Sequence, residues 1–124
     1  MRPTDEALVS AARQAKEKAY APYSHFSVGA AVDDGKVYTG CNVENGSYGL
    51  TSCAERNAVF AAVAAGCRKI YSVAVVADED YTLPCGACRQ VLAEFSAERI
   101  ILTAKDGRYR VVKATELFPQ PFSL

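Results

Sequence analysis

The chain has 124 residues, half of them apolar, and its 14 basic residues balance 14 acidic residues to a formal net charge of zero. This length is typical of a single domain, which we place over residues 1–124, and the lack of a basic excess argues against binding of nucleic acid through its phosphates. No apolar run approaches the roughly 20 residues that span a membrane, and the charged N-terminus lacks the apolar core of a signal peptide. We therefore expect a cytoplasmic protein with no membrane and no nucleic-acid partner, whose five cysteines are thiols or metal ligands.

The spacing of apolar residues predicts alternating helices and strands. Leu8, Ala12 and Ala15 share one helical face near the N-terminus, and the apolar run IYSVAVVA is typical of a central strand covered on both faces. In chain order, the predicted elements are a helix over about residues 4–19, strands over 26–32 and 37–43, a helix over 52–65, a strand over 70–77, a helix over 86–95, strands over 100–103 and 109–112, and a short last turn capped by Thr115. This order predicts an α/β fold, a three-layer α-β-α sandwich with one mixed five-stranded sheet.

Three cysteines lie where two of these helices are expected to begin. Cys53 belongs to the stretch TSCAERN, and Cys85 and Cys88 belong to LPCGACRQ. The dipole and the free N–H groups of a helix N-terminus stabilise thiolates. Three thiolates around one point leave a fourth tetrahedral position open, which is the arrangement of a catalytic zinc ion. A closed structural zinc site would need a fourth protein ligand.

The candidates for that fourth ligand are few. His25 is the only histidine. Cys67 lies one helix length from Cys53, about 20 Å, which is too far for a shared ion. Cys41 lies within a predicted strand and stays open as a ligand.

Glu55 follows Cys53 by two residues, so it falls in the first turn of the same predicted helix. From there its carboxylate can face the open metal position and move protons between a metal-activated water and a substrate. An acidic residue is also ordinary at a helix N-terminus. Beside three cysteines, the catalytic interpretation is the better one.

The segments C-A-E at residues 53–55 and P-C-G-A-C-R-Q at 84–90 resemble the zinc-dependent cytidine deaminases, in their small, homotetrameric, three-cysteine branch. The segments YSHFSVGAA and GCNVEN extend the resemblance over about residues 19–95. It implies a cytidine deaminase-like fold and a hydrolase that converts cytidine and deoxycytidine to uridine and deoxyuridine with release of ammonia, as in pyrimidine salvage. It also implies zinc as cofactor, a nucleoside substrate, and a homotetramer with active sites shared between subunits.

The resemblance assigns a role to individual residues. Cys53, Cys85 and Cys88 would hold zinc, and Glu55 would be the catalytic residue that carries protons to N3 of the pyrimidine and to the leaving ammonia. The implied substrate-binding residues are Phe26 against the base, the backbone of Ala54 at the base edge, Asn42 and Glu44 at the ribose 3′-hydroxyl, and Phe122 from a neighbouring subunit.

Two of the implied roles have an ordinary alternative. Zinc with three thiolates carries a net negative charge, and Arg56 would offset it by hydrogen bonding to the cysteine sulfurs, as polar groups around metal sites do. An ordinary surface arginine would instead pair with a carboxylate. Phe118 is the other aromatic of the tail, and either tail aromatic can simply pack on its own core.

Other functions share parts of this pattern. Blasticidin S deaminases have the same zinc motif, but the intact N-V-E-N sequence at residues 42–45 favours a true nucleoside. A dithiol redox protein would explain Cys85 and Cys88 and leave Cys53 and Glu55 unexplained. A zinc-stabilised binding protein without catalysis would have no need of Glu55.

Overall fold

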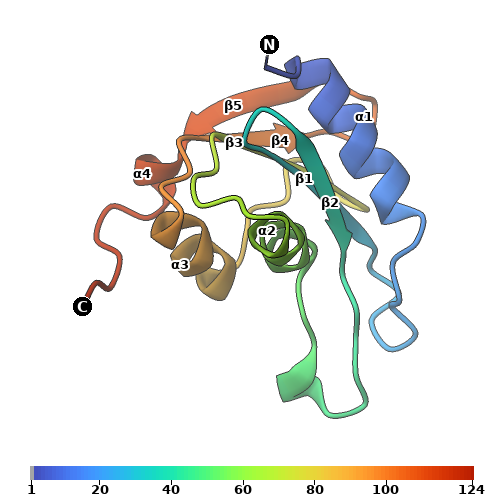
Figure 1. Cartoon of the computed structure of the whole chain (residues 1–124). Helices are drawn as coiled ribbons and strands as arrows, with labels where there is room; N and C mark the ends of the chain where they lie inside the picture. Colours follow the sequence, from blue (N-terminus) through green and yellow to red (C-terminus); the bar gives the residue numbers. More distant parts are fainter. Residues whose placement is uncertain (1) are drawn as a thin grey trace.

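In a computed structural model that describes residues 2–124, the chain forms one mixed five-stranded sheet with helices on both faces (Figure 1). The elements are α1 (Asp5–Lys16), β1 (Val28–Asp33), β2 (Val37–Cys41), the 3-10 helix η1 (Tyr48–Leu50), α2 (Ala54–Ala64), β3 (Ser72–Ala77), α3 (Gly86–Glu94), β4 (Arg99–Thr103), β5 (Tyr109–Lys113) and α4 (Ala114–Leu117). The strand order is β2-β1-β3-β4-β5. Only β3 and β4 pair in parallel among these strands of residues 2–124, so the predicted mixed sheet is confirmed.

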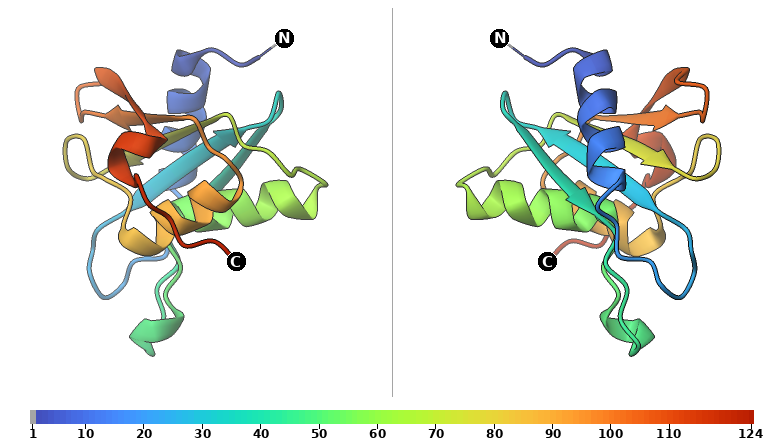
Figure 2. Two further views of the ribbon diagram at one scale, coloured as in Figure 1. Left: turned by 90° about the vertical axis from the view of Figure 1, so that its left-hand side faces the viewer. Right: turned by 90° about the vertical axis from the view of Figure 1, so that its right-hand side faces the viewer.

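The helices divide between the two faces of the sheet, as Figure 2 shows. On one face, α1 packs Leu8 and Ala12 against sheet residues that include Ala74 and Ile101. On the other face, α2 and α3 bury a larger apolar cluster that includes Val59 and Leu92. The central strand β3 is buried along its whole length, as its apolar sequence predicts. The predicted three layers are therefore confirmed.

The ends of several elements differ from the prediction. The first strand begins at Val28 rather than Phe26, since the side chain of Asn42 binds the Val28 N–H and the Phe26 carbonyl. Helix α1 ends at Lys16, about one turn earlier than predicted. The predicted cap Thr115 is wrong: α4 is capped by Lys113, and Thr115 lies within the helix.

The backbones of strand β2 and helix α2 are in direct contact at Gly40. A Cβ atom on Gly40 would lie 2.4 Å from the Ala58 nitrogen and 2.6 Å from the Ala54 oxygen, so only glycine fits there. The start of α2 is thereby fixed beside the end of β2. None of the helices in residues 2–124 is long and apolar enough to cross a membrane.

Candidate metal centre

The sulfur atoms of Cys53, Cys85 and Cys88 lie within 4.8 Å of one another. Cys53 Sγ is 3.7 Å from Cys85 Sγ, which is 3.3 Å from Cys88 Sγ. A tetrahedral zinc ion about 2.3 Å from each of three sulfurs would place them about 3.8 Å apart, so this donor set fits zinc. In the part of the chain that the structure describes, no other group of three His, Cys, Asp or Glu side chains comes as close.

The other candidate ligands lie outside the cluster. Cys41 Sγ donates to the Lys18 carbonyl, and Cys67 Sγ donates to the Lys69 carbonyl. His25 is exposed. A fourth position therefore remains for a small molecule rather than for one of these side chains.

Two helix N-termini bring the cysteines together. Cys53 is the N-cap of α2 and Cys85 is the N-cap of α3. The Cys85 sulfur also accepts the backbone N–H of Cys88, at 3.4 Å. Both helix dipoles therefore favour negative charge at the point where the sulfurs meet.

Arg56 provides a positive charge beside the sulfurs. Its Nη2 donates to Cys53 Sγ at 3.3 Å. Interaction with the Cys88 thiol, and then with Arg56 and Cys85, lowers the pKa of Cys53 to about 5 despite partial burial. The same interaction with Cys53, together with burial, raises the pKa of Cys88. Thus the predicted contact between Arg56 and a cysteine sulfur is present.

Glu55 lies in the first turn of α2 and is only 5% exposed. Burial, and to a lesser extent the negative charge of Cys53, raises the pKa of Glu55 to about 7. A backbone hydrogen bond at Glu55 and, more weakly, the charge of Arg56 act in the opposite direction. A carboxyl group with such a pKa both accepts and releases protons near neutral pH. Its position two residues from Cys53 places this capacity at the cysteine cluster.

The buried side chains of Asn42 and Glu44 organise a second group of residues. Asn42 Oδ1 accepts the Val28 N–H at 2.9 Å, and Nδ2 donates to the Phe26 carbonyl at 2.8 Å. One of its amide hydrogens remains for another acceptor.

Glu44 is held by a turn that precedes the first strand. Its Oε1 accepts the N–H groups of Tyr23 and Ser24 at 3.0 and 3.1 Å, and its Oε2 accepts the Ser24 hydroxyl. The bond from Ser24 is the main cause that lowers the pKa of Glu44, so this carboxylate is ionised at neutral pH. Since a carboxylate has about four acceptor positions, one is left for a further donor. No motif around Ser24 predicts this role.

A short bridge connects this second group to the cysteines. Val43 and Ser52 exchange two backbone hydrogen bonds, of 2.9 and 3.0 Å. Val43 lies between Asn42 and Glu44, and Ser52 directly precedes Cys53. The loop that contains η1 projects away from the sheet between these paired residues (Figure 1). The two groups of predicted site residues are therefore neighbours.

Phe122 differs from both groups of site residues in its exposure to solvent. Its side chain is 70% exposed, whereas Phe118 is half-buried. The side chain of Gln90 holds the Phe122 backbone through two hydrogen bonds. The packed tail aromatic is thus Phe118, and Phe122 is presented to solvent.

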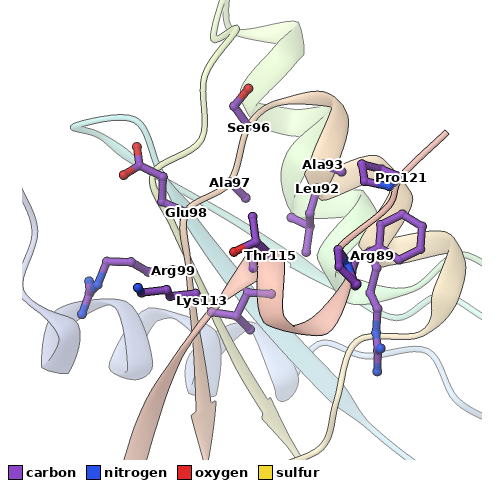
Figure 3. A pocket seen from close by; sticks show the side chains of 14 residues that line it. Arg89, Leu92, Ala93, Ser96, Ala97, Glu98, Arg99, Lys113, Thr115 and Pro121 are labelled. Atoms are coloured by element: carbon purple, nitrogen blue, oxygen red, sulfur yellow. The ribbon is translucent and has the colours of Figure 1, made fainter. Parts of the chain in front are cut away.

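A cavity lies elsewhere, beside the C-terminal half of α3. It measures about 530 Å³ and is lined by residues of α3, β4, β5, α4 and the tail, among them Leu92, Ile100 and Phe118. Figure 3 shows the side chains of Arg89, Leu92 and Pro121 around it. No cysteine lines this cavity, so the cysteine cluster lies outside it.

Comparison with known proteins identifies relatives along almost the whole chain. The family model described as cytidine and deoxycytidylate deaminase zinc-binding region matches residues 2–104. A cytidine deaminase of Sporosarcina psychrophila is 47% identical over 123 residues, which cover 95% of this chain and 90% of the relative. The crystal structure of a cytidine deaminase from Burkholderia pseudomallei, 51% identical, superposes with a TM-score of 0.89 over 97% of this chain and 100% of that chain. One from Mycobacterium tuberculosis, 42% identical, gives 0.82 over 98% of this chain and 100% of that chain.

Proposed function

The chain belongs to the cytidine and deoxycytidylate deaminase zinc-binding family, and we propose that it hydrolyses cytidine and deoxycytidine to uridine and deoxyuridine with release of ammonia. The family predicted from the C-A-E and P-C-G-A-C-R-Q motifs is thereby confirmed. The observation that carries the proposed activity is a buried carboxyl group, that of Glu55, in the turn that also holds one of three clustered thiols.

Zinc is the cofactor that fits the cluster, and Cys53, Cys85 and Cys88 are the residues that would hold it. When bound, zinc polarises a water molecule and lowers its pKa, which generates a nucleophile at neutral pH. Arg56 lies against Cys53 and offsets the negative charge of three thiolates.

Glu55 moves the protons of the reaction. As an oxygen atom bonds to C4 of the pyrimidine, Glu55 accepts a proton from the attacking water and delivers it to N3. Glu55 then takes the proton of the new C4 hydroxyl and delivers it to the departing amine as the C4–N4 bond breaks, so that ammonia leaves and the C4 carbonyl of the product forms. A pKa of about 7 suits both directions of transfer, because neither the acid nor the base form is then scarce.

The remaining site residues orient the nucleoside. Glu44 has one acceptor position left for the ribose 3′-hydroxyl, and Asn42 has one amide hydrogen left for its oxygen. Phe26, whose carbonyl is bound by Asn42, packs against the base. Ala54 is the first residue of α2, so its N–H has no acceptor within the helix and is available to the base edge.

The whole chain, residues 1–124, acts as one catalytic domain of a cytoplasmic homotetramer in which active sites are shared between subunits. Phe122 is the residue that would reach a neighbouring site. This assignment is supported by its exposed ring and by the two bonds from Gln90 that fix its backbone.

The experiment that tests the function is ammonia release from cytidine by the wild-type protein and by Glu55→Gln and Glu55→Ala, with the zinc content of each measured. We expect both variants to retain zinc and to lose activity by roughly 10²–10⁴, the range for a lost acid–base group. A Glu55→Ala protein that still deaminates at the wild-type rate would remove Glu55 from the mechanism. A zinc-loaded wild-type protein without ammonia release would instead point to a binding protein.

A further inference from the structure

Asn57 joins three segments of the site and contacts none of the predicted metal ligands with its side chain. It lies on α2, one turn after Cys53, whose carbonyl accepts the Asn57 N–H at 3.1 Å. Its Oδ1 accepts the Ser52 hydroxyl at 2.7 Å, and its Nδ2 donates to the Cys41 carbonyl at 2.7 Å. Both side-chain bonds are short and partly buried, so their geometry is well defined.

Each hydrogen-bond partner of the Asn57 side chain directly precedes a predicted site residue in the sequence. Ser52 directly precedes Cys53, and Cys41 directly precedes Asn42. One amide group therefore connects the residue before the first thiol with the residue before the predicted sugar ligand. The Val43–Ser52 bridge connects the same two segments a little further along.

The close contact between α2 and β2 makes this connection possible. Because Gly40 has no side chain, the helix backbone approaches the strand backbone directly, and the short side chain of Asn57 reaches the Cys41 carbonyl. If α2 lay further from β2, the hydrogen bond between the Asn57 amide and the Cys41 carbonyl would be lost. This bond therefore favours one spacing between α2 and β2.

We propose that Asn57 is a positioning residue for deamination, which sets the spacing between the sugar-binding segment that carries Asn42 and Glu44 and the helix that carries Cys53 and Glu55. The inference rests on the proposed role of Asn42 and Glu44 at the ribose. Asn57 does not touch the reacting atoms. It ensures that a nucleoside held by its sugar presents C4 at the cysteine cluster.

This role predicts a loss that depends on the sugar hydroxyl. If Asn57 only stabilised the fold, its removal would affect all substrates alike. If it aligns the sugar contacts with the reacting centre, its removal cancels the advantage that a 3′-hydroxyl gives. The informative quantity is therefore kcat/KM for 2′-deoxycytidine divided by kcat/KM for 2′,3′-dideoxycytidine, since the two differ only in the 3′-hydroxyl and undergo the same bond changes.

The test compares this ratio in the wild-type protein and in Asn57→Ala, with zinc content measured in both. We expect the variant to retain zinc and its ratio to fall roughly tenfold, the effect of about one hydrogen bond. Asn57→Asp keeps the acceptor for Ser52 and loses the donor to Cys41, so its ratio should fall as well. It serves as the second variant if Asn57→Ala does not fold, because any effect of its charge on the chemistry cancels in the ratio.

Ala61→Gly is the matched control. Ala61 is exposed on the same helix, and glycine there weakens the helix without removing either bond of Asn57. Its ratio should equal that of the wild type. Suppose that the wild-type ratio is well above one, and that Asn57→Ala lowers it no more than Ala61→Gly does. This result would overturn the inference about Asn57 and leave the proposed sugar contacts intact. A wild-type ratio near one overturns the proposed sugar contacts, and the inference with them.

Discussion

The side-chain amide of Gln90 binds both the N–H and the carbonyl of Phe122. Gln90 Nε2 donates to the Phe122 carbonyl and Gln90 Oε1 accepts the Phe122 N–H, each at 3.0 Å. The preceding residue, Arg89, donates to the carbonyls of Pro84 and Leu117 at 2.8 and 2.9 Å. The two residues that follow Cys88 therefore fasten the C-terminal segment to the helix that carries two of the thiols.

Replacing Gln90 by alanine should release the end of the chain. Two hydrogen bonds, each of about 1 kcal/mol, are lost, so we expect carboxypeptidase to remove the last residues roughly tenfold faster or more. The zinc content should stay the same. Gln14→Ala, on the exposed face of α1, is the control and should be trimmed at the wild-type rate. Equal trimming of both variants would contradict a fastening role for Gln90.

The proposed sharing of active sites can be tested by mixing two variants that each lack a different part of the predicted site. Phe122→Ala lacks the aromatic ring that we assign to a neighbouring site, and Glu55→Gln lacks the proton carrier in its own site. In a mixed oligomer some sites combine Glu55 of one subunit with Phe122 of another. Deaminase assays after subunit exchange should therefore show more activity than the sum of the separate variants. Strictly additive activity would mean that Phe122 serves only its own subunit.

Removing the positive charge at Arg56 should weaken zinc binding. Arg56→Ala leaves the thiolate charge without its hydrogen-bonding cation, and such partners of metal ligands typically contribute 10–100-fold to affinity or activity. The measurement is transfer of zinc to a coloured chelator, with Arg13→Ala on α1 as the control. Identical zinc transfer from Arg56→Ala and Arg13→Ala would show that the contact with Cys53 has no effect on the metal.

Alanine at Gly40 should force β2 and α2 apart. Its Cβ would lie 2.4 Å from the Ala58 nitrogen, and backbone atoms do not rotate away as a side chain does. We expect the free energy of unfolding to fall by roughly 1–3 kcal/mol, the usual cost of overpacking, as measured by urea denaturation. Gly49→Ala has nothing within 4 Å of its new Cβ and should change stability by less than about 0.5 kcal/mol. The prediction fails if the two variants are equally stable.

The pair Asp5–Arg99 should make a pH-dependent contribution to stability. Arg99 donates to both carboxylate oxygens, at 2.9 and 2.8 Å, and this hydrogen bonding lowers the pKa of Asp5 below its ordinary value of 3.8. A lowered pKa in the folded state stabilises the protein above the unfolded-state pKa, and this stabilisation is lost as the pH falls through the folded-state value. Asp5→Asn should therefore cost roughly 0.2–1 kcal/mol at pH 7, and less below about pH 4.

Urea unfolding of Asp5→Asn and the wild type at pH 7, 5 and 3.5 measures this difference. Glu116→Gln, an exposed carboxyl group on α4, is the control. A difference that stays constant down to pH 3.5 would show that the charge of Asp5 does not contribute.

Periodicity was enough to predict the order of the elements and the layers of this fold. The ends of the elements were not predictable, because side chains from distant segments decide them. Strand β1 begins at Val28 because the amide of Asn42 takes the bonds on either side of Ser27. No local pattern around residue 26 carries that information.

The same distinction applies to the site. Cys53, Glu55 and the Cys85/Cys88 pair were predictable since their chemistry is visible in short motifs at helix starts. The bonds Ser24–Glu44 and Asn57–Cys41 join residues 20 and 16 positions apart. They form only because the β1–β2 hairpin, the loop that contains η1 and α2 fold against one another. The roles of such common residue types therefore cannot be predicted from the neighbouring sequence.

The spread of the thiols along the chain also determines when the metal centre can assemble during synthesis. Cys53 and Cys85 meet across 32 residues of sequence, and β3 and the start of α3 lie within or directly after that span. Closing such a loop has an entropic cost that only the later packing of β3 and α3 against the sheet offsets. On the ribosome, Cys53 therefore lacks both of its partner thiols until the start of α3 has emerged, and we expect the metal centre to assemble late in the synthesis of the chain.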